Sequence, residues 1–206
     1  MLPEHLRERL VPIGPAEMRT SGKFVLYWAH HALRAHDNPA LETAAAIALG
    51  LGLPLLVYQG LGGRHRYNSD RHHRFILEAA RDFSTQLAER GQRLVFHLPE
   101  NSPAKLMARS AVVVSELYPV PPFTNWYRQH CEANPDLPLL LVDSSCILPM
   151  PISSQAPTRA FQFRRKHEEE LRARVARGWQ DTDRWPHGFA GSVGFDPFYL
   201  SASLPD

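Results

Sequence analysis

An apolar run that turns polar and then becomes helical is the feature that most constrains the fold of this chain. Residues 24–29 read FVLYWA, a continuous apolar stretch of the kind found in strands that are covered on both faces. A polar segment with three histidines and Arg34 follows, before an alanine-rich run begins after Pro39. Asp37 or Asn38 suits the N-cap of a helix, and Pro39 suits its first position because the fixed φ of proline is helical. The pattern therefore predicts a buried strand, a polar loop and a helix.

Four more apolar runs repeat this pattern along the chain. With the first run, the predicted strands are residues 24–29, 54–59, 93–98, 111–115 and 138–142. The helices between them are predicted at residues 39–49, 70–90, 103–109 and 123–133. Strands that alternate with helices form a parallel sheet with right-handed crossovers and helices on both faces. We therefore expect an α/β protein with a doubly wound, Rossmann-like, three-layer α/β/α fold, built on a five-stranded parallel sheet in the order 3-2-1-4-5.

The two ends of the chain lack this alternation. Residues 1–22 predict a surface lead-in with no more than a short helix, since glycine and proline interrupt anything longer. Residues 23–143 form the predicted α/β domain. Residues 144–206 begin as a loop, continue as a charged helix over 158–177 and end as an irregular, aromatic tail. The tail has too many aromatic residues for a free linker, so we expect it to pack on the domain or on a partner.

Composition and charge exclude several classes of protein. The net charge is +2 with neutral histidines, so no overall positive potential favours direct binding of nucleic acid. Cys131 and Cys146 are too few for a disulfide framework and lack the spacing of a zinc site. No apolar run approaches the ~20 residues that a membrane-spanning helix needs, and the N-terminus has no signal-peptide core. We expect a cytoplasmic protein with no membrane partner.

The candidate binding site lies where the predicted strand order reverses, between the first and fourth strands. Doubly wound sheets bind their ligands there, outside the carboxyl ends of the strands. Asp37 and Asn38 would cap a helix at this edge and would also lie where a ligand is held. Glu116 ends the fourth strand and is either an acceptor for a ligand or a partner of Arg34. The candidate cofactor-binding residues are His30, Arg34, Asp37, Asn38, Gln59 and Glu116.

Metal and nucleophilic chemistry have little support in the sequence. His30 and His31 are adjacent, so they point to opposite faces of an extended chain. Ser115 lacks the flanking glycines of a nucleophile elbow. Neither a Walker A motif nor a dinucleotide-binding glycine fingerprint is present. We predict no metal site and no catalytic residue in this chain.

Several motifs resemble the N-terminal domain of the DNA photolyase/cryptochrome family, with the class II CPD photolyases as the closest group. The first is YW at residues 27–28, followed by LRxxDNxAL at residues 33–41. The similarity continues through PLLVYQ at 54–59, RFIL at 74–77, and residues 91–98 and 103–106. It returns in APTRAFQFRRK at 156–166, so the resemblance covers about residues 24–172.

This resemblance implies an antenna domain for light-dependent repair of pyrimidine dimers in DNA. In relatives such a domain holds a light-harvesting pterin (folate) or deazaflavin, and FAD lies in a separate helical domain. We expect no such helical domain within these 206 residues. FAD would then come only through a missing domain or a protein in trans, and DNA would be contacted indirectly. The family's enzymes are deoxyribodipyrimidine photo-lyases, but we expect no catalysis from this chain alone. The alternatives are a nucleotide-binding or protein-interaction module of the same fold without photochemistry.

Overall fold

The computed structural model describes residues 2–61, 69–98, 102–153 and 158–200. Part of the APTRAFQFRRK motif, residues 156 and 157, lies outside these ranges. In chain order the elements are α1 (Glu4–Arg7), β1 (Leu10–Ile13), β2 (Val25–Trp28), α2 (Pro39–Leu51), β3 (Leu55–Gly60), α3 (Asp70–Glu89), β4 (Leu94–His97), α4 (Ala104–Met107), β5 (Val112–Glu116), α5 (Phe123–Ala133), β6 (Leu139–Val142), the 3₁₀ helix η1 (Met150–Ile152) and α6 (Ala160–Arg177). No helix among the described residues has the length and apolar character to cross a membrane.

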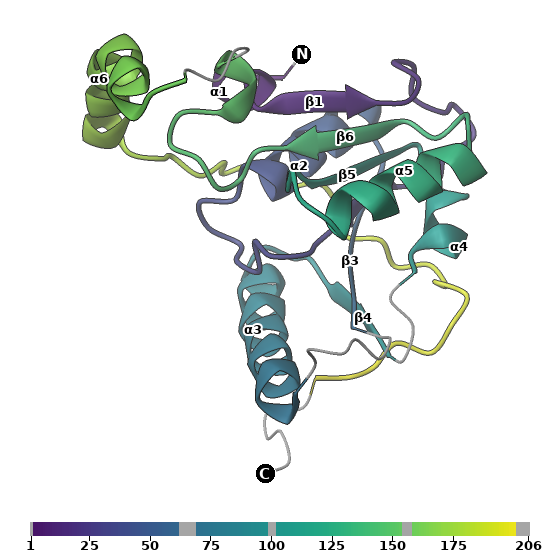
Figure 1. Ribbon diagram of the computed structural model, residues 1–206. Coiled ribbons are helices and arrows are strands. Elements are labelled where there is room, and N and C mark those ends of the chain that lie inside the picture. Colours follow the sequence, from purple (N-terminus) through teal and green to yellow (C-terminus); the bar gives the residue numbers. More distant parts are fainter. Residues whose placement is uncertain (1, 62–68, 99–101, 154–157, 201–206) are drawn as a thin grey trace.

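The strands form one mostly parallel sheet in the order β1-β6-β5-β2-β3-β4 (Figure 1). The strands predicted from the apolar runs lie next to one another in the expected order, β4-β3-β2-β5-β6, and all pair in parallel. The expected number of five strands was wrong, because β1 pairs antiparallel with β6 and adds a sixth. The sequence of β1 is only LVPI, and its proline lies at the sheet edge, where a missing N–H is tolerated. So short a run inside the expected lead-in gave no recognisable strand pattern.

Two apolar clusters lie on the two faces of the sheet. Side chains alternate along β2, so Tyr27 packs on the face covered by α2 and α3, and Trp28 packs on the face covered by α4 and α5. Phe83 of α3 and Tyr127 of α5 are almost fully buried in these clusters. Fully burying one side chain of this size contributes about 1.5–3 kcal/mol. The three-layer arrangement expected from the sequence is thus present.

The tail (residues 178–200) packs along the domain instead of extending into solvent. The backbone of Leu55, at the start of β3, accepts the amide of Phe189 and donates to the carbonyl of His187, both at 2.9 Å. Further along, the Phe198 amide donates to the carbonyl of Phe96 in β4 at 2.8 Å. These bonds hold the tail against the β3–β4 side of the sheet.

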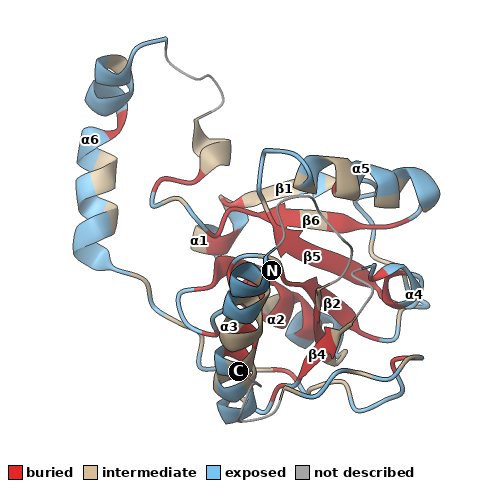
Figure 2. Ribbon diagram, turned by 60° about the horizontal axis from the view of Figure 1, so that its bottom comes forward, coloured by how far each residue is buried: buried red, intermediate tan, exposed pale blue. Residues whose placement is uncertain are grey.

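Helix α6 lies apart from the sheet and is exposed over most of its surface (Figure 2). Its main polar anchor is near its last turn, where both terminal nitrogens of Arg174 donate to the carboxylate of Glu8, at 2.7 and 2.8 Å. These two side chains are largely buried, with exposed fractions of 12% and 17%. The ion pair therefore attaches the end of α6 to the segment between α1 and β1.

Candidate functional site

A buried carboxylate joins β5 to the loop that follows β2. The Tyr27 hydroxyl donates to Oε1 of Glu116 at 2.6 Å, and the amide of His30 donates to Oε2 at 3.0 Å. Glu116 has no exposed surface. Burial raises the pKa of Glu116 to about 7, although the hydrogen bond from Tyr27 opposes that rise. In this structure Glu116 holds the loop in place and does not face solvent.

Asn38 connects the same loop to helix α2. Its Oδ1 accepts the amide of Leu41 at 3.0 Å, which makes it the N-cap that the sequence predicted. Its Nδ2 donates to the carbonyls of Ala32 and Arg34, at 3.0 and 2.8 Å, and to the hydroxyl of Tyr27 at 3.2 Å. One buried amide therefore satisfies polar groups of the helix, the loop and the strand.

Arg34 and Asp37 shape the outer part of the loop. The guanidinium of Arg34 donates to the carbonyl of Asp37 at 2.9 Å and to the carbonyl of Ser144 at 3.2 Å, so its described partners do not include Glu116. Asp37 has a φ of 47°, a left-handed conformation that aspartate adopts more readily than most residues. Its amide donates to the carboxylate of Asp181 in the tail at 2.8 Å.

His30 lies within a group of aromatic rings on the α5 side of the sheet. Its ring centroid is 4.3 Å from that of Trp28, 5.1 Å from Phe123 and 5.9 Å from Trp126. Its Nε2 atom is buried and has no hydrogen-bond partner. Burial, with smaller contributions from His31 and His130, lowers the pKa of His30 to about 3. The imidazole is therefore neutral at physiological pH and can still donate or accept one hydrogen bond.

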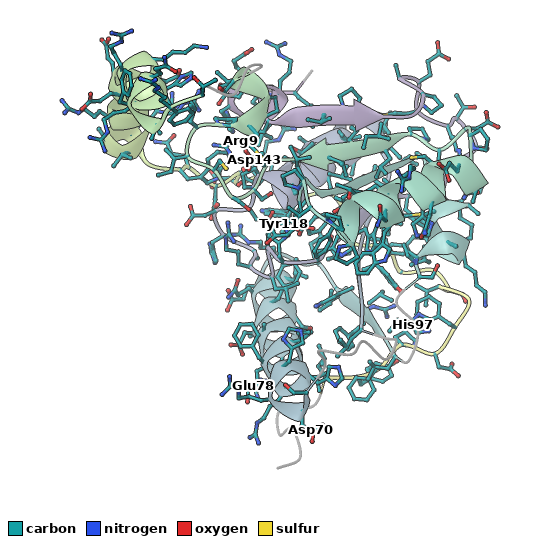
Figure 3. The ribbon with its side chains drawn as sticks, in the orientation of Figure 1. Arg9, Asp70, Glu78, His97, Tyr118 and Asp143 are labelled. Atoms are coloured by element: carbon teal, nitrogen blue, oxygen red, sulfur yellow. The ribbon has the colours of Figure 1, made fainter. Side chains whose placement is uncertain are left out.

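Exposed rings continue this group toward solvent. The centroid of His31 is 5.0 Å from that of Tyr118, and Tyr118 is 4.8 Å from Phe123. Tyr118 is 38% exposed, and Figure 3 shows it at the carboxyl end of the sheet. We call His30, His31, Tyr118, Phe123 and Trp126 the aromatic cluster. It combines a neutral polar atom with flat apolar surfaces.

Gln59 lies on the α2–α3 face of the sheet, the face of Tyr27 and Glu116. Its neighbour Tyr58 packs on the α5 side, so alternation directs Gln59 toward α2 and α3. The side chain is only 3% exposed, and its Oε1 has no hydrogen-bond partner. The structure thus joins Asn38 to Glu116 through Tyr27 and His30 to Glu116 directly, and it places Arg34 and Asp37 beside them. Among the described residues, no hydrogen bond joins the Gln59 side chain to the other five. Whether the six bind a cofactor stays a prediction.

The sequence analysis missed the ring side chains that surround His30. Tyr118, Phe123 and Trp126 follow the fourth predicted strand, and they come from a loop and the first turn of α5. The available signal was the pair Phe123 and Trp126, three residues apart and therefore on one helix face. Among the described residues, no group of three or more His, Cys, Asp or Glu side chains is placed to hold a metal ion.

Comparisons with known proteins agree with the motifs. The family model for DNA photolyase matches residues 25–177. The chain is 31% identical over 151 residues to the deoxyribodipyrimidine photo-lyase of Methanothermobacter thermautotrophicus, a match over 71% of this chain and 33% of that protein. It is 36% identical over 101 residues to Cryptochrome-1 of Drosophila melanogaster, over 45% of this chain and 17% of that protein. The matches thus span a third or less of these relatives. The chain belongs to the DNA photolyase/cryptochrome family.

Proposed function

We propose that this chain is the α/β part of a photolyase-type protein that acts in light-dependent repair of pyrimidine dimers in DNA. Its own role is to bind an antenna chromophore, a pterin (folate) or a deazaflavin, at the aromatic cluster. When bound, such a chromophore absorbs near-UV or blue light and passes the excitation energy to FAD. Membership of the family and the similarity to a deoxyribodipyrimidine photo-lyase support the repair role.

The observation that carries the binding proposal is the unpartnered Nε2 atom of His30 among aromatic rings. Phe123 and Trp126 offer flat surfaces on which a fused heteroaromatic ring can stack. The buried Nε2 of His30 lies behind these rings. It is suited to a ring nitrogen or carbonyl of a chromophore that displaces one of them. Asn38 and Glu116 do not contact the chromophore in this proposal. Their hydrogen bonds fix the loop that carries His30.

The remaining parts of the reaction lie outside this α/β domain. FAD and the damaged DNA would be held by a helical domain, either in a longer form of this chain or in a partner protein. The match covers 33% of the photo-lyase. The rest of that relative is long enough to hold such a domain. On this proposal the α/β domain collects light and the helical domain performs the electron transfer.

Chromophore binding can be tested with the purified chain. The protein is mixed with methenyltetrahydrofolate or with 8-hydroxy-5-deazaflavin, passed through a desalting column and measured for retained absorbance above 350 nm. We expect retention of one of the two. We also expect Phe123→Ala to weaken that binding by roughly fivefold, since one aromatic contact is worth about 1 kcal/mol. The matched control is Phe161→Ala, which removes an exposed ring of α6 far along the sequence from the cluster.

Two results would contradict the binding proposal. One is that neither chromophore is retained by a folded protein. The other is that Phe123→Ala and Phe161→Ala affect binding equally, which would place the chromophore elsewhere.

A further inference from the structure

A cavity lies on the other side of the loop that follows β6. It has a volume of about 530 Å³ and opens between α1, the start of α2, residues 144–147 and the end of α6. Loop residues separate it from the aromatic cluster, since Ser144 accepts from Arg34 and Ser145 contacts His31 on the cluster side. The cavity volume falls within the range of about 300–1,000 Å³ that is usual for small-molecule sites.

Arg9 is a buried cation in the wall of this cavity. It is 5% exposed, and its guanidinium donates only to backbone carbonyls, those of Asp143, Cys146 and Ile147. Its Nε has no hydrogen-bond partner. Figure 3 shows Arg9 beside Asp143 at the end of β6. The carboxylates of Asp143 and Glu8 act on Arg9 electrostatically, but neither forms an ion pair with it among the described residues, and Nε keeps an unused donor.

Arginines outnumber carboxylates among the residues that line the cavity. Its lining holds three arginines, at positions 9, 174 and 177, and two carboxylates, Glu8 and Asp37. Both carboxylate oxygens of Glu8 accept hydrogen bonds from Arg174. Arg177 is exposed at the rim, and the described residues give it no ion-pair partner. Burial and the charge of Arg177 lower the pKa of His5, which also lines the cavity. An anion entering here would meet the exposed guanidinium of Arg177 and the unpartnered Nε donor of Arg9.

An apolar wall faces these charges. Ile147 and Val175 are 54% and 64% exposed, which is unusual for large aliphatic residues that line a cavity. The ring of Trp179 is held in place, because its Nε1 donates to Glu42 at 2.6 Å and the guanidinium of Arg9 lies 5.1 Å from its centroid. A flat apolar group would cover surface that water now touches.

The first residues of α2 form part of the cavity wall, but they offer a ligand no free backbone N–H donor. Pro39 has no N–H, the amide of Ala40 donates to Ser144, and that of Leu41 donates to Asn38. Recognition of a ligand would therefore depend on side chains. Arginine forks match the oxygens of a phosphate in both geometry and charge.

We propose that this cavity binds a nucleoside monophosphate, with the phosphate toward Arg9 and Arg177 and the base against Trp179, Ile147 and Val175. This site is distinct from the aromatic cluster and does not depend on the proposed antenna role. It combines the two properties that such a ligand needs, a cationic pocket and a flat apolar wall, within a single cavity.

The test is calorimetric titration of the full chain with AMP. We expect saturable binding of one AMP per chain, and binding of adenosine and of inorganic phosphate that is weaker by about tenfold or more, because each lacks one of the two contacts. Val175→Glu places a negative charge on the cavity wall at an exposed helical position that tolerates glutamate. It should weaken AMP binding by about tenfold through charge repulsion.

Ala173→Glu is the matched control, since it makes the same change of charge on α6 at an exposed position outside the cavity lining. It should leave AMP binding within about twofold, and Arg177→Gln should weaken AMP but not adenosine. Phe123→Ala should not alter AMP binding, whatever its effect on a chromophore. Absence of saturable AMP binding by the folded protein, or equal effects of Val175→Glu and Ala173→Glu, would overturn the proposal.

Discussion

Tyr27 and Glu116 are 89 residues apart in sequence, yet the Tyr27 hydroxyl donates to the Glu116 carboxylate at 2.6 Å inside the protein. The pKa of this carboxyl group is raised to about 7 by burial, from an ordinary value of 4.5. The folded protein therefore keeps a proton that the unfolded chain releases at lower pH. The contribution of Glu116 to stability is complete below about pH 4.5 and decreases as the pH rises toward 7.

Replacing Glu116 by glutamine should remove this pH dependence. We expect the free energy of unfolding of the unaltered protein to fall between pH 4.5 and 7 by up to about 3 kcal/mol more than that of Glu116→Gln. Urea titrations across this range measure the difference. Glu89→Gln, at an exposed position of α3, is the control and should follow the unaltered protein. Parallel curves for the unaltered protein and Glu116→Gln would show that the carboxyl group does not titrate in this way.

Substitution of Asn38 by alanine should destabilise the protein by about 2–4 kcal/mol. It removes a helix cap, worth about 1 kcal/mol, and leaves the carbonyls of Ala32 and Arg34 without their donor. Ser69 caps α3 at an exposed position with one side-chain bond, so Ser69→Ala should cost about 1 kcal/mol or less. Chemical denaturation measures both values. A cost for Asn38→Ala no larger than that of Ser69→Ala would mean that its bonds to the loop contribute little.

The docking of the tail should depend on Asp181. Its carboxylate accepts from the amide of Asp37 at 2.8 Å, from the guanidinium of Arg90 at 3.2 Å and contacts the ring of His36 at 2.9 Å. Asp181→Ala should therefore increase the rate of tryptic cleavage after Arg184 several-fold. The exposed Asp82 of α3, away from the cleaved bond, provides the control substitution Asp82→Ala, which should leave the rate nearly unchanged. Unaltered cleavage in Asp181→Ala would show that other contacts hold this part of the tail.

The attachment of α6 should depend on Arg174. Arg174→Met breaks the largely buried pair with Glu8 and leaves that carboxylate without its partner, at a cost of about 1–3 kcal/mol. Hydrogen exchange of the α6 amides should accelerate, because the helix has few other contacts with the domain. Arg172→Met removes a more exposed pair with Glu168 on the same helix and should change the exchange far less. Equal acceleration in the two variants would show that the Glu8 pair is not the anchor.

Local sequence patterns were enough to predict most of the sheet. Each parallel strand is a continuous apolar run, and Asn38 and Pro39 mark the start of α2 by their chemistry alone. β1 escaped prediction because its pairing with β6 joins segments more than a hundred residues apart. Nothing within LVPI itself distinguishes an edge strand from a loop.

The strand order predicted which candidate residues meet, and their role as a site stays a prediction. His30 and Glu116 do meet at the carboxyl end of the sheet, as the strand order implied. The sequence does not reveal that the carboxylate is enclosed by Tyr27, or that Phe123 and Trp126 surround the imidazole. These contacts join three separate segments, and they depend on side-chain packing that no local pattern encodes.

The path of the tail has a practical consequence for anyone who shortens this chain. A boundary placed after α6 would look natural on a diagram of the sheet. It would nevertheless remove the residues that bond to the backbone of Leu55. It would also remove the carbonyl of Pro186, which accepts from the side-chain amide of Gln92. A shortened chain that keeps all of these bonds extends at least to Phe198, whose amide bonds to β4. Residues without regular secondary structure are here an integral part of the folding unit.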